Sequence, residues 1–244
     1  MFRIILLLGS ISSLFNVESK KIVGGTAIPI EKAPYVVSVQ YNDYKHFCGG
    51  SLISKNLILS AAHCFEEMDP KGITFRLGSA NSTSGGILIP AKKIELHEKY
   101  NSKPIKNDIA IILLNETVQK NSSHRASYKE PPQGSQTFAS GWGVKKFGEK
   151  ITPEELQGVY LDTISKKECQ KAFGSTKIDD KTICAYSEDK DTCRGDSGGP
   201  LAWKAKLLGI VSWGIGCAKK HPGVYTSVPK HYKWIQKTKK ILEE

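Results

Sequence analysis

The stretch "CRGDSGGP" at residues 193–200 sets a single serine, Ser197, among three glycines, an aspartate and a proline. It fits a tight turn that presents a nucleophilic hydroxyl, because glycine adopts backbone conformations that a Cβ would forbid. It also spells Arg194-Gly195-Asp196, a tripeptide found in adhesive proteins. The choice between a nucleophile and a docking loop depends on what the rest of the chain supplies.

A serine hydroxyl is a weak nucleophile until a base takes its proton, and a third group must orient that base. His63 lies in "LSAAHC" (residues 59–64), where an apolar run leads into small residues. Asp108 lies in "NDIAIILL" (107–114), where an apolar strand would partly bury its carboxylate. With these surroundings, and with the chain order His, Asp, Ser, residues 22–244 resemble the trypsin-like serine proteases along their whole length.

The resemblance implies a role for each of these residues. Ser197 attacks the scissile carbonyl, His63 accepts and later returns the proton, and Asp108 orients the imidazole and stabilises its charged form. The backbone N–H groups of Gly195 and Ser197 form the oxyanion hole. The sequence therefore favours the nucleophile over the docking loop.

The segment "SKKIVGG" at residues 19–25 resembles a family activation site. By that resemblance, cleavage after Lys21 exposes the α-amine of Ile22, which pairs with Asp196 and orders the oxyanion loop. A buried carboxylate without a partner is costly, so this ion pair would act as a switch. The chain is expected to be a zymogen.

The residue six positions before the nucleophile is Asp191, which the family places at the base of the primary specificity pocket. A carboxylate there would attract the charged end of Arg or Lys and favour cleavage after those residues. The remaining substrate-binding positions are expected at Ser212, Gly214 and Gly223.

Three positions depart from the family pattern. Arg194 stands where trypsins often have glutamine, which suggests a preference for acidic residues beyond the scissile bond. Tyr186 stands where trypsins often have glycine, so the resemblance does not predict the conformation of the outer loop of the pocket. Residues 79–86, "SANSTSGG", lack the carboxylates that Ca²⁺ requires, so no calcium site is expected there.

Short β-rich runs separated by turn-forming pairs, among them Gly49-Gly50, predict an all-β barrel or sandwich. The family resemblance specifies two Greek-key six-stranded β-barrels. The runs are 35–40, 56–60, 73–77, 108–114, 158–164, 207–213 and 223–228. Only residues 229–242 have a clear helical pattern, with one apolar face that is expected to dock on a barrel.

Six cysteines and no Cys-x-x-Cys spacing indicate disulfides rather than a zinc ribbon, and counting alone leaves 15 pairings open. The resemblance implies the pairs Cys48–Cys64, Cys169–Cys184 and Cys193–Cys217. Three Asn-x-Ser/Thr sequons are candidate glycosylation sites, at Asn81, Asn115 and Asn121.

The basic N-terminus, the apolar run of residues 4–8 and the serines that follow are typical of a signal peptide. The expected organisation is a signal and activation segment (1–21) and a peptidase domain (22–244). Within that domain, a first barrel at about 22–120 and a second barrel with a helix at about 136–244 flank a connector at about 119–135. Secretion is expected.

The formal net charge of +11 suits acidic substrates or polyanionic surfaces. No basic run is interleaved with aromatic residues, so nucleic-acid binding is not expected. The expected partners are substrates with Arg or Lys at the cleaved bond, serine protease inhibitors and an activating protease. A monomer without metal, cofactor or membrane contact is expected.

Two alternatives remain open from the sequence. A non-catalytic homologue would keep the fold and only bind partners, although such proteins usually lose a member of the triad. A protease of chymotrypsin-like specificity would prefer large apolar residues, which Asp191 argues against.

Overall fold

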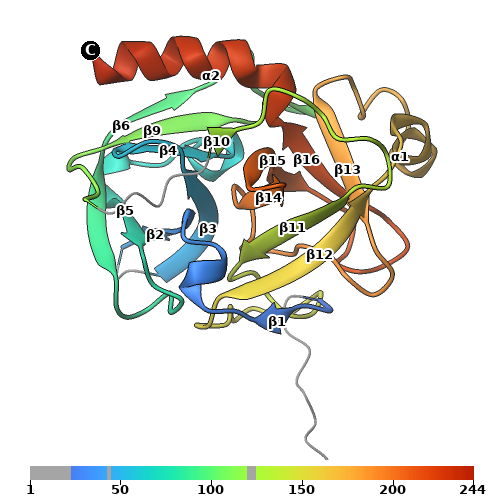
Figure 1. Ribbon diagram of the computed structural model, residues 1–244, viewed down its shortest axis with the longest axis horizontal. Helices are drawn as coiled ribbons and strands as arrows, with labels where there is room; N and C mark the ends of the chain where they lie inside the picture. The colour runs from blue at the N-terminus through green and yellow to red at the C-terminus, as the bar shows by residue number, and fades with distance from the viewer. Residues whose placement is uncertain (1–22, 43–44, 120–124) are drawn as a thin grey trace, which may run out of the picture.

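The computed structural model describes residues 23–42, 45–119 and 125–244. The expected signal and activation segment, Lys21, Ile22 and the sequon at Asn121 lie outside these ranges. Figure 1 shows two barrels side by side, with a long helix across the top of the view.

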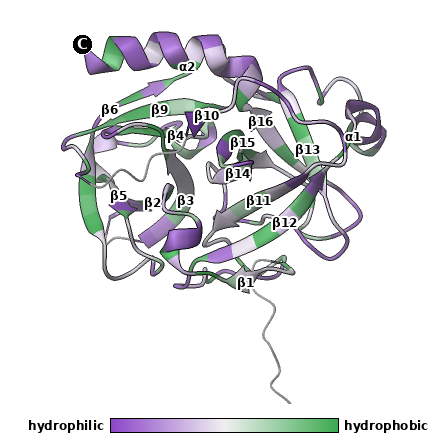
Figure 2. Cartoon of the chain, in the orientation of Figure 1, coloured by the Kyte–Doolittle hydropathy of each residue, from purple (hydrophilic) through white to green (hydrophobic). Residues whose placement is uncertain are grey.

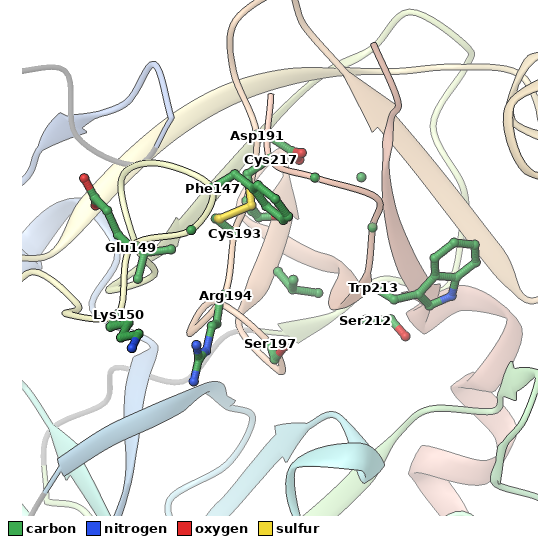
Figure 3. Close-up of a pocket in the computed structure, with 17 residues that line it drawn as sticks. Phe147, Glu149, Lys150, Asp191, Cys193, Arg194, Ser197, Ser212, Trp213 and Cys217 are labelled. Atoms are coloured by element: carbon green, nitrogen blue, oxygen red, sulfur yellow. A yellow bond between two sulfur atoms is a disulfide. The ribbon is translucent and has the colours of Figure 1, made fainter. Parts of the chain in front are cut away.

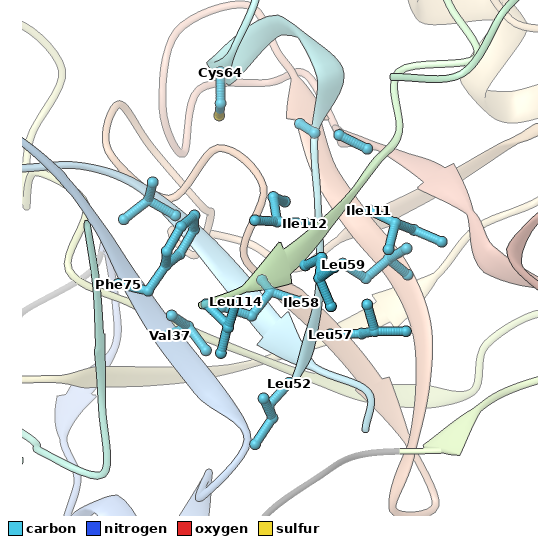
Figure 4. Packing of buried hydrophobic residues seen from close by; sticks show 14 of the residues in the cluster. Val37, Leu52, Leu57, Ile58, Leu59, Cys64, Phe75, Ile111, Ile112 and Leu114 are labelled. Carbon is cyan, nitrogen blue, oxygen red and sulfur yellow. The ribbon is translucent and has the colours of Figure 1, made fainter. Parts of the chain in front are cut away.

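The first barrel closes through six antiparallel strands in the order β2-β3-β4-β9-β6-β5. Their bounds are β2 (Val36–Tyr41), β3 (Lys45–Leu52), β4 (Leu57–Ser60), β5 (Ile73–Leu77), β6 (Ile87–Leu96) and β9 (Ala110–Leu114). β-Branched and leucine side chains fill its interior, with Phe75 among them (Figure 4). All five residues of β9 are buried, as expected for a strand that reads as one apolar run.

The second barrel has the strand order β12-β11-β14-β15-β16-β13 and closes through pairing of β12 with β13. Its strands are β11 (Gln136–Gly141), β12 (Gln157–Thr163), β13 (Thr182–Tyr186), β14 (Pro200–Trp203), β15 (Lys206–Trp213) and β16 (Gly223–Ser227). Two short strands attach to it: β1 (Thr26–Ala27) to β12, and β10 (Arg125–Ala126) to β15. The expected fold of two six-stranded barrels is confirmed.

Short elements complete the chain. They are the 3-10 turns η1 (Ile30–Lys32), η2 (Ala62–Cys64) and η3 (Pro70–Gly72), the hairpin β7 (Asn101–Ser102) and β8 (Ile105–Lys106), and the helices α1 (Lys166–Phe173) and α2 (Val228–Glu243).

The C-terminal helix α2 begins one residue before the predicted start and ends one residue later. Its first turn is capped by Ser227, whose hydroxyl accepts a hydrogen bond from the Lys230 N–H at 3.3 Å. Ile235 and Leu242 are buried, and the helix contacts β9 and β15. Hydrophilic and hydrophobic residues alternate along α2 in Figure 2, and most of its lysines are exposed. No helix among the described residues is long and apolar enough to cross a membrane.

The prediction that only the end of the chain is helical was wrong, because α1 forms in the second half. Its signal is a capping box: the Ser165 hydroxyl accepts from the Glu168 N–H at 3.1 Å, and the Glu168 carboxylate accepts from the Ser165 N–H at 2.9 Å. Eight residues with only Cys169 and Phe173 buried give too short an apolar pattern to stand out.

The prediction of a turn at Gly49-Gly50 was also wrong, since both glycines lie inside β3. A Cβ on Gly49 would lie 2.8 Å from the Gly199 Cα, and one on Gly50 would lie 2.8 Å from a methyl of Ile58. These glycines allow close packing rather than a reversal of the chain. The Gly49 N–H donates to the carbonyl of Ser197 at 2.7 Å, so this contact joins the two barrels.

A buried arginine organises the loop of residues 79–86, where the sequence predicts no calcium site. The Arg76 guanidinium donates to the carbonyls of Ser82 (3.0 Å), Thr83 (3.2 Å) and Gly85. Arg76 is only 7% exposed. The guanidinium of Arg76 therefore holds this loop through three of its backbone carbonyls, the most buried of which is that of Ser82.

We predict that Arg76→Met destabilises the protein by about 1–3 kcal/mol, because it removes the guanidinium hydrogen bonds that hold this loop, although the Ser82 carbonyl keeps a donor in Gln40. Thermal unfolding followed by circular dichroism measures the loss, and Lys146→Met, at an exposed lysine, is the control. Added Ca²⁺ or a chelator should leave the unfolding temperature of the unmodified protein unchanged. A rise in that temperature with Ca²⁺ would contradict the absence of a calcium site.

Candidate active site

His63 and Asp108 meet at one end of the first barrel. His63 lies in η2 after β4, and Asp108 lies two residues before β9. The His63 Nδ1 is 2.8 Å from Asp108 Oδ2, and the His63 backbone N–H donates to Oδ1 at 2.9 Å. Because both carboxylate oxygens are engaged, the position of the imidazole relative to the acid is fixed.

The second barrel also holds this aspartate. The Ser212 hydroxyl donates to Asp108 Oδ2, and the Thr226 hydroxyl donates to the Asp108 carbonyl at 2.8 Å. Asp108 is 1% exposed, whereas the His63 side chain is 26% exposed. The acid is thus buried between the barrels, and the imidazole reaches the surface.

Ser197 lies in the loop before β14, next to His63. Cys64 Sγ is 3.9 Å from His63 Nε2 and 3.7 Å from the Ser197 carbonyl, so both residues contact the same sulfur atom. Among the described residues, no acceptor takes the N–H of Gly195 or Ser197. Two free donors beside a hydroxyl can stabilise a developing oxyanion.

His46 holds the carbonyl of this loop, a role that sequence reasoning missed. Its Nε2 lies 2.9 Å from the Gly195 carbonyl, and its Nδ1 lies 2.8 Å from the Ser38 hydroxyl. Burial lowers the pKa of His46 to about 4, although the Gly195 contact opposes the shift. The neutral ring can donate from Nε2 to the Gly195 carbonyl and accept the Ser38 hydroxyl at Nδ1. In the sequence, only its position directly before "FCGG" (residues 47–50) pointed to it.

Asp196 is buried beneath the same loop. Its carboxylate accepts the N–H of Gly143 at 2.8 Å and the N–H of Cys193 at 2.9 Å. Burial raises its pKa to about 6 despite these two donors. A Cβ on Gly141 or Gly143 would lie 2.3 Å or 2.2 Å from a carboxylate oxygen, so these glycines make the room for the acid.

A cavity of about 540 Å³ opens beside Ser197. The predicted nucleophile and the four residues predicted for the substrate pocket line the same cavity: Ser197, Asp191, Ser212, Gly214 and Gly223. Figure 3 shows Asp191 set back from Ser197, near the Cys193–Cys217 disulfide. Arg194 also lines the cavity, whereas Tyr186 does not.

Asp191 supplies a carboxylate inside this cavity. Its side chain is 5% exposed, and burial raises its pKa to about 7, opposed by the N–H groups of Ala218 and Thr192. The Ala218 N–H donates to Oδ2 at 3.1 Å. Gly223 leaves access to this acid, since a Cβ there would lie 3.0 Å from Asp191 Oδ1.

The six cysteines form the three pairs implied by the resemblance, Cys48–Cys64, Cys169–Cys184 and Cys193–Cys217. The first lies beside His63 and the third joins two walls of the cavity. Cys48, His63 and Cys64 are close enough for a metal ion, but both sulfur atoms are in a disulfide and cannot serve as thiolate ligands.

The sequons in the described region differ in accessibility. Asn115 is exposed, whereas the Asn81 amide donates to Glu154 at 3.4 Å and accepts the Thr83 N–H at 2.8 Å. The side chain of Asn81 is therefore engaged, and Asn115 is the better candidate for modification.

The two barrels and this site define the chymotrypsin-like class of fold. A family model described as Trypsin matches residues 22–235. The chain is 42% identical over 230 residues to a trypsin of Sarcophaga bullata, covering 91% of this chain and 90% of that protein. It is 40% identical over 227 residues to Trypsin Blo t 3 of Blomia tropicalis, covering 88% and 85%. Trypsin epsilon of Drosophila erecta is 39% identical over 224 residues, covering 89% and 87%.

The chain therefore belongs to the trypsin family and is a trypsin-like serine endopeptidase. This finding favours the enzyme over the non-catalytic homologue left open by the sequence.

The pKa of His63 provides a test of the His63–Asp108 pair. Burial lowers this pKa, but the hydrogen bond and charge of Asp108, aided by Glu66, raise it above its usual 6.5. We predict that Asp108→Asn brings the pKa of His63 below 6.5, because burial is then uncompensated. Titration of the imidazole by NMR measures the shift, with Glu116→Gln as a distant control. An unchanged pKa in Asp108→Asn would show that the pair does not control the imidazole.

Proposed function

We propose that this protease is secreted as a zymogen and, once activated, hydrolyses peptide bonds after Arg or Lys. The observation that carries the proposal is the buried carboxylate of Asp191 in the same cavity as Ser197. Members of this family act on proteins and are targets of serine protease inhibitors.

In the proposed mechanism, Ser197 Oγ attacks the scissile carbonyl while His63 Nε2 takes its proton. Asp108 keeps the proton of His63 on Nδ1 and stabilises the imidazolium that forms. The oxyanion is held by the N–H groups of Gly195 and Ser197, each donor contributing about 3 kcal/mol in the transition state. His63 then protonates the leaving amine. Water, losing a proton to His63, attacks the acyl-enzyme carbonyl, and His63 returns that proton to Ser197 Oγ as the acid product leaves.

The proposed specificity follows from the cavity. When a guanidinium or ammonium enters beside Asp191, it loses contacts with water and gains an ion pair with the carboxylate. An apolar side chain instead leaves that acid buried and unpaired. Gly214 and Gly223 have no side chain that could block a long basic residue. Ser212 and Gly214 would pair through their backbone with the extended substrate.

Zymogen activation is supported by the position of the chain just after Ile22. The Asp191 N–H donates to the Val23 carbonyl at 3.1 Å, so this segment lies beside the loop that leads to the nucleophile. Among the described residues, no cation pairs with Asp196. An α-amine released at Ile22 by an activating protease would supply that charge.

The test begins with protein cleaved after Lys21 and confirmed to start at Ile22. It is assayed with matched peptides that have Arg, Lys, Phe or Tyr before the cleaved bond. We predict that Arg and Lys exceed Phe and Tyr in kcat/KM by about 30-fold to several thousandfold, the equivalent of 2–5 kcal/mol for one stranded charge. Ser197→Ala should abolish turnover, and Asp191→Ser should remove the preference for Arg and Lys.

Three results would each contradict a different part of the proposal. Absence of turnover in folded, correctly processed protein would reject the roles of Ser197, His63 and Asp108. Preferred cleavage after Phe or Tyr would reject Asp191 as the specificity residue. Full activity of protein that retains Lys21 would reject the zymogen.

Arg194 gives a further prediction for the leaving-group side of the substrate. It is exposed at the cavity next to Ser197, and Figure 3 shows its charged end on the same side as that of Lys150. An exposed ion pair contributes about 0.2–1 kcal/mol. Arg194→Gln should therefore reduce the ratio of kcat/KM for Asp over Lys after the cleaved bond by about 2- to 5-fold, with Lys204→Gln as control. Equal rates for the two peptides in the unmodified enzyme would contradict this preference.

A further inference from the structure

A basic groove lies away from the active-site cavity, where β10, β15 and α2 meet (Figure 1). It has a volume of about 300 Å³ and shares no lining residue with the cavity at Ser197. Its described lining residues are Ile53, Arg125, Ala126, Tyr128, Lys206, Tyr232, Ile235, Gln236 and Lys239. Three of these side chains are cationic and none is a carboxylate. We call this feature the β10 groove.

Strand pairing places like charges side by side in the β10 groove. β10 and β15 are parallel, and Arg125 is the direct partner of Lys206 in their register. Neighbouring cations on adjacent strands repel each other. Lys239 of α2 adds a third positive charge to the same groove. Its contact with Glu243, at 3.8 Å on the helix surface, offsets that charge only weakly.

The tyrosines of the groove are already engaged. The ring centroids of Tyr128 and Tyr232 are 6.3 Å apart at 66°, and the ammonium groups of Lys129 and Lys206 lie 5.6 and 5.1 Å from the centroid of Tyr128. Tyr128 is 57% exposed, but two ammonium groups already lie against its ring, so a nucleic-acid base that stacks there would compete with them. β15 is already paired with β10, β14 and β16, so it has no free edge for an extended peptide.

We propose that the β10 groove binds a sulfated polysaccharide. Such a chain brings closely spaced anions, which would relieve the repulsion between Arg125 and Lys206 and pair with Lys239. It needs neither base stacking nor a free strand edge. The three segments are far apart in the sequence, which is why no basic motif revealed the site.

The test uses Ser197→Ala protein, so that binding is measured without proteolysis and independently of the proposed function. The probe is a fluorescent heparin octasaccharide, with an unsulfated oligosaccharide of equal length as control. The groove variant changes Arg125, Lys206 and Lys239 to Gln. The matched control changes the exposed Lys167, Lys171 and Lys177, in and after α1, to Gln and loses the same charge.

We expect the groove variant to weaken heparin binding at least 10-fold in 150 mM salt and the matched control to weaken it less than 3-fold. The slope of log Kd against log salt should fall by about 2 to 3 in the groove variant, since each lost contact releases about one fewer counterion. Unchanged unfolding temperatures would show that both variants are folded. Equal weakening by the two variants would overturn the proposal, as would failure of the octasaccharide to bind. Equally tight, groove-dependent binding of polyglutamate or single-stranded DNA would overturn the choice of ligand.

Discussion

The arrangement of the site depends on the hydrogen bonds that the buried carboxylate of Asp108 accepts. This carboxylate accepts two hydrogen bonds from His63 in the first barrel and one from Ser212 in the second, while Thr226 holds the carbonyl of Asp108. A nearly fully buried charge is tolerated only when such donors surround it. The two barrels must therefore pack in one relative position for this acid to be satisfied, and that position brings the Ser197 loop next to His63.

A second constraint lies beneath the loop that contains Ser197. Asp196 occupies space left by Gly141 and Gly143, and two backbone N–H groups only partly offset its burial, since its pKa is raised to about 6. From the other side, His46 holds the Gly195 carbonyl. The loop is thus fixed by contacts to both barrels, which keeps two N–H groups free at the point where an oxyanion would form.

The residues proposed for the site could be picked out from the sequence because each of them lies in a short, distinctive stretch. "AAHC", "NDIA" and "GDSGGP" could be read without knowing how they meet, and β5 was predicted with its observed bounds at Ile73–Leu77. Features that depend on contacts between distant segments were missed. Gly49 and Gly50 looked like a turn because their sequence does not show Gly199 and Ile58, which lie against them in space. The β10 groove is hidden for the same reason, since its cations come from three separate segments.

Charged side chains in this protein have different roles depending on whether they are buried with partners, buried without an opposite charge, or exposed at the surface. Arg76 donates to carbonyl oxygens and has a structural role, while the cations of the β10 groove line one groove at the surface. Asp191, by contrast, is a buried acid without a cationic partner among the described residues, and burial raises its pKa to about 7. A cation that binds there lowers this pKa, so binding near neutral pH is coupled to release of a proton. Below about pH 7 that proton must be removed before the cation can pair. The affinity for a basic side chain should consequently rise with pH until Asp191 is already ionised in the free enzyme. This pH dependence of binding is separate from the one that the ionisation of His63 gives to catalysis.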